Sequence, residues 1–117
     1  MVATRTTERY LRFLRLKEAV FLALSRAPLD AKERALLDIV VMHWKLDEPL
    51  SVREAMVSLA RLGSPSTVQR RLSRLKELGY LTHTSGPSNK KIKWLAPTQL
   101  TLTYFNELGV AMLGAMK

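Results

Sequence analysis

The side chains best suited to recognising another molecule through hydrogen bonds are concentrated between residues 64 and 74. Arginine can pair through two bonds with guanine, glutamine with adenine, and serine or threonine with several bases or with phosphate. A helical period places most of these side chains outside an apolar stripe formed by Val68, Leu72 and Leu75. The stretch therefore predicts a helix that contacts base edges and phosphates. The candidate residues are Ser64, Ser66, Thr67, Gln69, Arg70, Arg71, Ser73 and Arg74.

A second set of candidate residues follows in a predicted β-hairpin. Residues 80–84 and 92–96 are short and rich in β-forming side chains, and residues 85–89 contain the Gly, Pro, Ser and Asn of a loop. Lysines at the tip of such a hairpin can reach an adjacent minor groove or the DNA backbone. The candidate residues of this hairpin are Asn89, Lys90, Lys91 and Lys93.

The charge of the chain is large and unevenly distributed. Its 117 residues include 19 lysines and arginines against 10 aspartates and glutamates, which gives a net charge of +9. Residues 63–83 and residues 84–98 each carry a net +3, whereas residues 30–50 carry a net −2. The excess predicts an anionic partner, either nucleic acid or a membrane surface. The uneven distribution favours one binding face over uniform polycation behaviour.

Other kinds of chemistry find little support in the sequence. There is no cysteine, and His43 and His83 are the only histidines, so we expect no disulfide, no metal site and no cofactor. No nucleophile triad, glycine-rich phosphate loop or pair of catalytic carboxylates is present, so we do not expect an enzyme. Charges interrupt every apolar stretch, which argues against a signal peptide or a membrane span and for a cytoplasmic protein.

The elements that must position the candidate residues follow from caps and apolar periods. Helices are expected over 7–26, 30–45, 51–62 and 64–79, with Thr7, Asp30, Ser51 and Ser64 as their caps. The hairpin follows, and Thr98 or Thr101 caps a last helix. The expected fold class is mostly α with a small β-hairpin: a winged helix-turn-helix with flanking N- and C-terminal helices.

The stretch 64–84, SPSTVQRRLSRLKELGYLTHT, resembles the recognition helix and first wing strand of MarR-like winged-helix regulators. The matching features are a Thr67-Val68-Gln69-Arg70 core, a Leu-rich run that ends at Gly79, and a strand that starts at Leu81. The resemblance covers about residues 30–100. It implies a homodimer whose first and last helices interlock, and it implies that Thr67, Gln69 and Arg70 face the major groove.

The sequence thus predicts a single domain over 1–117. It would consist of an N-terminal dimerisation helix (1–28), a winged helix-turn-helix core (30–98) and a C-terminal helix (99–117). The expected function is sequence-specific binding of double-stranded DNA by a homodimeric transcriptional regulator, a repressor. One alternative is an interaction module of a replication, partition or other assembly, and another is a non-specific nucleic-acid binder. The basic first helix could instead lie on an anionic membrane, but a dimer interface explains more of the chain.

Overall fold

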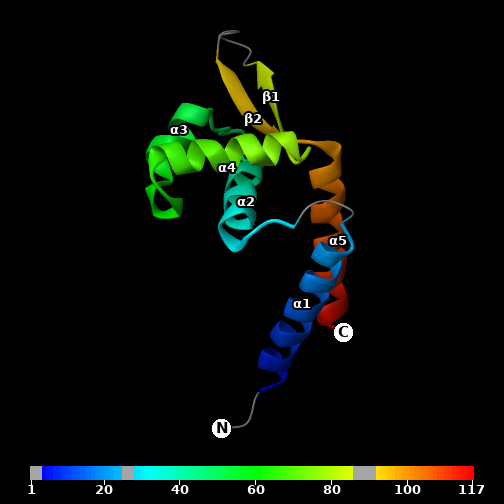
Figure 1. Cartoon of the computed structure of the whole chain (residues 1–117). Helices are drawn as coiled ribbons and strands as arrows, with labels where there is room; N and C mark the ends of the chain where they lie inside the picture. Colours follow the sequence, from blue (N-terminus) through cyan, green and yellow to red (C-terminus); the bar gives the residue numbers. More distant parts are fainter. Residues whose placement is uncertain (1–3, 25–27, 86–91) are drawn as a thin grey trace. The chain divides into compact units, whose positions relative to one another are not determined.

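The computed structural model describes residues 4–24, 28–85 and 92–117, and the chain divides into two compact units. One unit comprises residues 29–101, and the other comprises residues 1–28 together with 102–117. Across the described residues the elements are five α-helices, one short 3-10 turn and a two-stranded antiparallel hairpin (Figure 1). The expected fold class is confirmed.

Three helices of the first unit begin at the caps that the sequence predicts. Asp30, Ser51 and Ser64 each accept a hydrogen bond from the backbone N–H three residues further on. Such a cap satisfies one of the N–H groups that the first helical turn leaves without a partner. The elements are α2 (Ala31–Lys45), α3 (Val52–Ser58), the 3-10 turn η1 (Ala60–Leu62) and α4 (Pro65–Glu77).

The hairpin pairs β1 (Leu81–Ser85) with β2 (Lys93–Pro97) in antiparallel register, with Leu81 opposite Pro97. A third short segment, which the sequence did not reveal, extends it. Ser51 forms a β-bridge with Trp94, and the Leu95 N–H donates to the Leu50 carbonyl at 2.7 Å. The end of the expected loop 46–50 therefore holds β2 against the start of α3.

The core of this unit is where α2, α4 and the hairpin meet. The stripe on α4 predicted from helical spacing is fully buried, which confirms that part of the prediction. A buried contact also joins the hairpin to the start of the last helix, because the Thr101 hydroxyl donates to the Tyr80 carbonyl at 2.6 Å. The largest buried side chains here are Tyr80, Leu36, Leu37, Leu75, Leu81, Val40, Val68 and Thr101.

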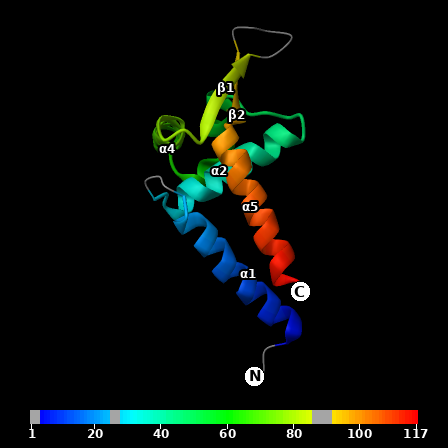
Figure 2. The same cartoon turned by 90° about the vertical axis from the view of Figure 1, so that its right-hand side faces the viewer.

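The second unit is a pair of antiparallel helices, α1 (Arg5–Leu22) and the part of α5 (Gln99–Ala115) from residue 102 on, which lie side by side in Figures 1 and 2. The rings of Phe21 and Tyr104 are 6.3 Å apart, and Arg12 donates to the Lys117 carbonyl at 2.8 Å. Of the two candidate caps for α5, Thr98 is the one whose hydroxyl accepts from the backbone N–H of Thr101.

The expected cap of α1 was wrong. Thr4, one turn earlier than Thr7, caps this helix, because the Thr7 N–H donates to the Thr4 hydroxyl oxygen at 3.0 Å. Two threonines at this spacing offer the same chemistry, and the earlier one adds a turn of helix. The helix ends at Leu22 rather than near residue 26, and residues 25–27 lie outside the described ranges.

The two helices of the second unit leave much apolar surface uncovered. On α1 only Phe21 is buried, and Tyr10 is 59% exposed. Leu113 of α5 is 62% exposed. None of the helices in the described ranges is long and apolar enough to cross a bilayer. The exposed large apolar residues of this unit are Tyr10, Leu11, Leu14, Leu16, Leu22, Val110, Met112, Leu113 and Met116.

The turn before α4 yields a test of the fold. Gly63 has φ of +136°, and a Cβ atom there would lie 2.8 Å from Thr67 Cγ2. We expect Gly63→Ala to lower the free energy of unfolding by about 1–3 kcal/mol, since this backbone region is nearly restricted to glycine. Gly109→Ala is the control, because no atom lies within 4 Å of its added Cβ, and it should be neutral or stabilising. Denaturant unfolding measures both variants, and an equal loss of unfolding free energy in Gly63→Ala and Gly109→Ala would contradict this account.

Candidate nucleic-acid interface

The helix α4 presents only part of its predicted set of contact residues to solvent. Ser66, Gln69, Arg70 and Ser73 are exposed on the side of the helix away from its buried stripe. Neither Gln69 nor Arg70 has a hydrogen-bond or ion-pair partner within the described part of the chain. These four side chains therefore form one exposed polar face, which we call the α4 face.

Ser64 and Thr67 form a polar cluster at the N-terminus of α4. The Ser64 hydroxyl accepts from the Thr67 N–H at 3.3 Å and donates to the Thr67 hydroxyl at 3.0 Å. The hydroxyls of Ser64 and Ser66 are also 3.3 Å apart. Pro65 occupies the first helical position, where a missing N–H removes no helical bond. These contacts fix the start of the helix and leave Thr67 half-buried.

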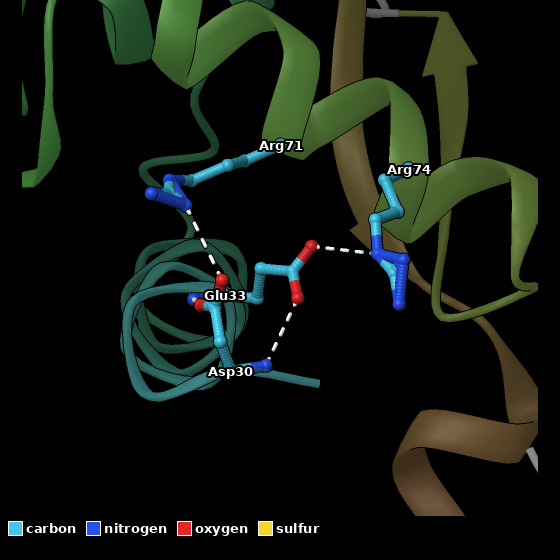
Figure 3. Close-up of polar contacts among 4 residues, drawn as sticks. All are labelled: Asp30, Glu33, Arg71 and Arg74. Carbon is cyan, nitrogen blue, oxygen red and sulfur yellow. Dashed lines mark hydrogen bonds and ion pairs between the residues drawn. The ribbon is translucent and has the colours of Figure 1, made fainter. Parts of the chain in front are cut away.

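Arg71 and Arg74 lie on the other flank of α4 and reach back to the first turn of α2 (Figure 3). Arg74 Nε donates to Glu33 Oε2 at 2.8 Å, and Arg71 Nη1 lies 3.6 Å from Asp30 Oδ2. The other oxygen of each carboxylate completes a capping box: Glu33 Oε1 accepts from the Asp30 N–H, and Asp30 Oδ1 accepts from the Glu33 N–H. We call these four residues the α2–α4 clamp.

The clamp changes the charge that is available to a partner. Glu33 is only 5% exposed, and the Arg71 side chain is 16% exposed, so these groups are engaged within the unit. The sequence assigned a net charge of +6 to α4 and the hairpin. The clamp pairs two of the seven cations in these segments with carboxylates of α2, which leaves a net +4. We therefore leave Arg71 and Arg74 out of the α4 face, although the sequence grouped them with it.

Only one of the predicted hairpin residues can be placed. Lys93 is exposed at the start of β2, opposite Ser85 of β1. Asn89, Lys90 and Lys91 lie outside the described residues. Their assignment to the interface stays a prediction.

Lys76 and His83 line a groove between α4 and the hairpin. The sequence did not identify either residue as a candidate for binding a partner. Lys76 Nζ lies 3.3 Å from His83 Nδ1. Partial burial, followed by repulsion from Lys76 and Lys93, holds the pKa of His83 below the ordinary value of 6.5. Alternation along β1 could have found His83, because a strand places it on the same face as the buried Leu81.

A second groove, of about 730 Å³, has the opposite character. Trp44 and Trp94 contribute its aromatic walls, and Asp47, Glu48 and Glu54 contribute carboxylates. Acidic side chains repel phosphate, so this side of the unit is a poor surface for nucleic acid. The contrast with the α4 face and Lys93 gives the unit one side suited to an anionic partner.

Comparison with known proteins agrees with this geometry. No protein-family model matches the chain, and no curated protein matches its sequence. The transcriptional regulator Tm0710 from Thermotoga maritima is 22% identical, with a TM-score of 0.61 over 97% of this chain and 77% of that one. A mutant of MepR from Staphylococcus aureus, bound to an oligodeoxyribonucleotide, is 11% identical, with a TM-score of 0.58 over 98% and 80%.

The heme sensor PefR from Streptococcus agalactiae, in complex with heme, is 18% identical, with a TM-score of 0.57 over 93% of this chain and 67% of that one. At these identities the likeness shows the fold. The chain is a winged-helix protein, and its fold is that of the MarR-like regulators, as the motif at residues 64–84 implied.

The clamp yields a stability prediction. Glu33→Gln removes the charge that Arg74 contacts at 2.8 Å, and it should lower the free energy of unfolding by about 1–3 kcal/mol. Glu77→Gln on the exposed side of α4 is the matched control, and its effect should stay within about 0.5 kcal/mol. Denaturant unfolding of both variants measures the difference. A Glu33 variant as stable as the control would show that the clamp does not hold α4 in place.

Proposed function

We propose that the chain is a sequence-specific double-stranded DNA-binding protein that regulates transcription, as a homodimer and as a repressor. The observation that carries this proposal is the α4 face, an exposed polar helix surface beside a basic hairpin in a winged-helix fold. In a helix-turn-helix the second helix presents the side chains of its N-terminal part to base edges in the major groove.

The chemistry of the α4 face supports base readout. Arg70 can donate two bonds to guanine and Gln69 can pair with adenine, while the hydroxyls of Ser66 and Ser73 suit bases or phosphate. Because the clamp binds the far flank of the helix to α2, these side chains project from a rigidly held element. A site held in this way loses less entropy when it binds.

The solved neighbours support a binding role over a catalytic one. Tm0710 is named a transcriptional regulator, and the MepR mutant is bound to an oligodeoxyribonucleotide. By analogy, α4 of this chain would enter the major groove. The lysines of the hairpin, Lys90, Lys91 and Lys93, would then contact phosphates or the adjacent minor groove. Asn89 would add a polar contact at the same tip.

The apolar surface of α1 and α5 supports a homodimer. Monomeric proteins rarely leave large apolar side chains exposed in adjacent groups, and here eight of them lie on two helices, with Met116 directly after the second. A second copy of the same chain offers a matching apolar surface under two-fold symmetry. A dimer would also supply the second recognition helix that a two-fold-symmetric DNA site requires.

The readout proposal predicts different effects for two neighbouring arginines. Arg70→Ala should weaken binding to the preferred duplex by about 1–3 kcal/mol and flatten the preference at one base position. Arg71→Ala is the comparison variant, because its side chain points to Asp30. Any loss of affinity from a weakened clamp should then be the same for both duplexes, and the base preference should stay unchanged. The preferred site comes from sequencing the pool that binds from randomised duplexes, and affinities are then measured on that site and on scrambled duplex.

The same measurements separate the alternatives. If Arg70→Ala lowers both affinities by one factor, Arg70 does not read bases. If the unaltered chain binds duplexes but selects no sequence, the protein is a non-specific binder. If the unaltered chain binds no duplex at all, the regulator proposal fails, and the alternative of an interaction module in a larger assembly takes its place.

The assembly proposal has its own test. Sedimentation should show a dimer at micromolar concentration, and Leu113→Glu should shift it toward monomer because a charge would enter the apolar contact. Asn106→Glu, at an exposed polar position of the same helix, should leave the dimer intact. A monomeric unaltered chain would refute the homodimer.

A further inference from the structure

The groove between α4 and the hairpin consists of two adjoining hollows. One, of about 220 Å³, lies against the α4 face and includes Gln69 and Ser73. The other, of about 230 Å³, follows the hairpin to Ser85 and Lys93. Both hollows include Lys76, Thr82 and His83 in their lining. The groove therefore leads from the proposed base-reading side chains directly to the hairpin.

Among the residues that the structure describes, every charged group that lines this groove is cationic. α4 contributes Lys76, β2 contributes Lys93, β1 contributes the titratable His83, and α3 contributes only the apolar Val52. Glu77 follows Lys76 on α4 but is not part of the lining. Hydroxyl groups of Ser73, Thr82, Thr84 and Ser85 add neutral donors. This is a set of donors suited to a tetrahedral oxyanion.

The contact between Lys76 and His83 bears on the protonation state of the imidazole. An ammonium group has donors only, so in a hydrogen bond with Lys76 Nζ, 3.3 Å away, the Nδ1 atom of His83 accepts. An accepting ring nitrogen carries no proton, so this contact favours the neutral ring, in the same direction as the lowered pKa. The imidazole thus lies near two cations, Lys76 and Lys93, and its Nδ1 atom can become a hydrogen-bond donor by taking up a proton.

We infer that this groove binds one phosphate group of the DNA backbone, and that His83 takes up a proton when the phosphate binds. The inference rests on the proposed function and adds to it a phosphate site and a dependence on pH. The backbone strand that runs between the base-reading helix and the hairpin is the part of a duplex placed to supply this phosphate.

The physical reason for proton uptake is the exchange of partners at Lys76. A phosphate oxygen is a stronger acceptor for the ammonium than an imidazole nitrogen, so Lys76 turns to the phosphate and frees Nδ1. The negative charge of the phosphate offsets the repulsion that Lys76 and Lys93 exert on a protonated ring. A protonated Nδ1 then donates to the anion and adds a third charged contact.

The sign of the pH dependence follows from the two states of His83. In the free protein the pKa of His83 lies below 6.5, and in the complex it is higher, so the complex binds more protons. Affinity for DNA therefore rises as pH falls through the interval between the two pKa values. Each unit by which the phosphate raises the pKa of His83 corresponds to about a tenfold gain in affinity across that interval.

The first experiment follows the ring protons of His83 by NMR from about pH 5 to about pH 8. The titration is made on the free protein, with inorganic sulfate, and with duplex DNA. Sulfate has the tetrahedral shape of a phosphate diester and keeps a constant charge over this range. Both anions should raise the pKa of His83. Lys76→Met should raise the pKa in the free protein, because one source of repulsion is lost.

The second experiment measures affinity for the selected duplex against pH. His83→Gln should remove the gain in affinity at low pH, and His43→Gln, the matched control, should keep it. Lys76→Met should also reduce the slope of log affinity against log salt by about one. A gain that survives in His83→Gln overturns the inference and leaves the proposed function intact.

The two experiments distinguish the two possible failures. If duplex binds and the pKa of His83 in the complex is unchanged, the phosphate site is wrong and the regulator proposal stands. If no duplex binds at any pH, the proposed function fails. The titration with sulfate then tests, without DNA, whether the groove binds an anion. An unchanged pKa with sulfate then overturns the anion site as well.

Discussion

Two carboxylates in the first turn of α2 determine how the winged-helix unit presents α4. Each carboxylate uses one oxygen to close the capping box and the other to hold an arginine of α4. The negative charges also lie at the N-terminus of α2, where the helix dipole favours them. The same two carboxylates that begin one helix therefore orient the next, and they leave the α4 face as the side that projects outward. Arg71 Nε is buried without an acceptor among the described residues, so this arrangement is not free of cost.

The clamp shows how far the sequence could predict the site. The Asp30–Glu33 capping box is local, and its spacing alone predicted it. The pairing of Glu33 with Arg74 joins residues 41 positions apart, and it depends on which flank of α4 packs on α2. Helical periodicity separates buried from exposed positions but does not distinguish one exposed flank from another. For this reason the sequence placed Arg71 and Arg74 beside Arg70, and only the structure separates them.

Other differences between the sequence-based expectations and the structure can also be traced to particular residues. The pairing of Leu50 and Ser51 with β2 escaped notice because it is too short for any alternation and follows a proline. His83 was weighed only as a metal ligand, since a lone histidine in a strand has no motif. The hairpin, the buried stripe of α4 and the caps of α2, α3 and α4 were all predictable, because each depends on residues within a few positions of one another. Contacts between elements were not.

The two tryptophans of the chain, Trp44 and Trp94, line the same groove between the end of α2 and the hairpin. Both belong to the unit of residues 29–101, and neither α1 nor α5 contains one. All tryptophan fluorescence of the molecule therefore originates beside this groove. The emission is a local reporter of that groove, with one indole on a helix and the other on a strand. Rearrangements of α1 and the later part of α5 take place among residues that carry only tyrosine and phenylalanine as chromophores.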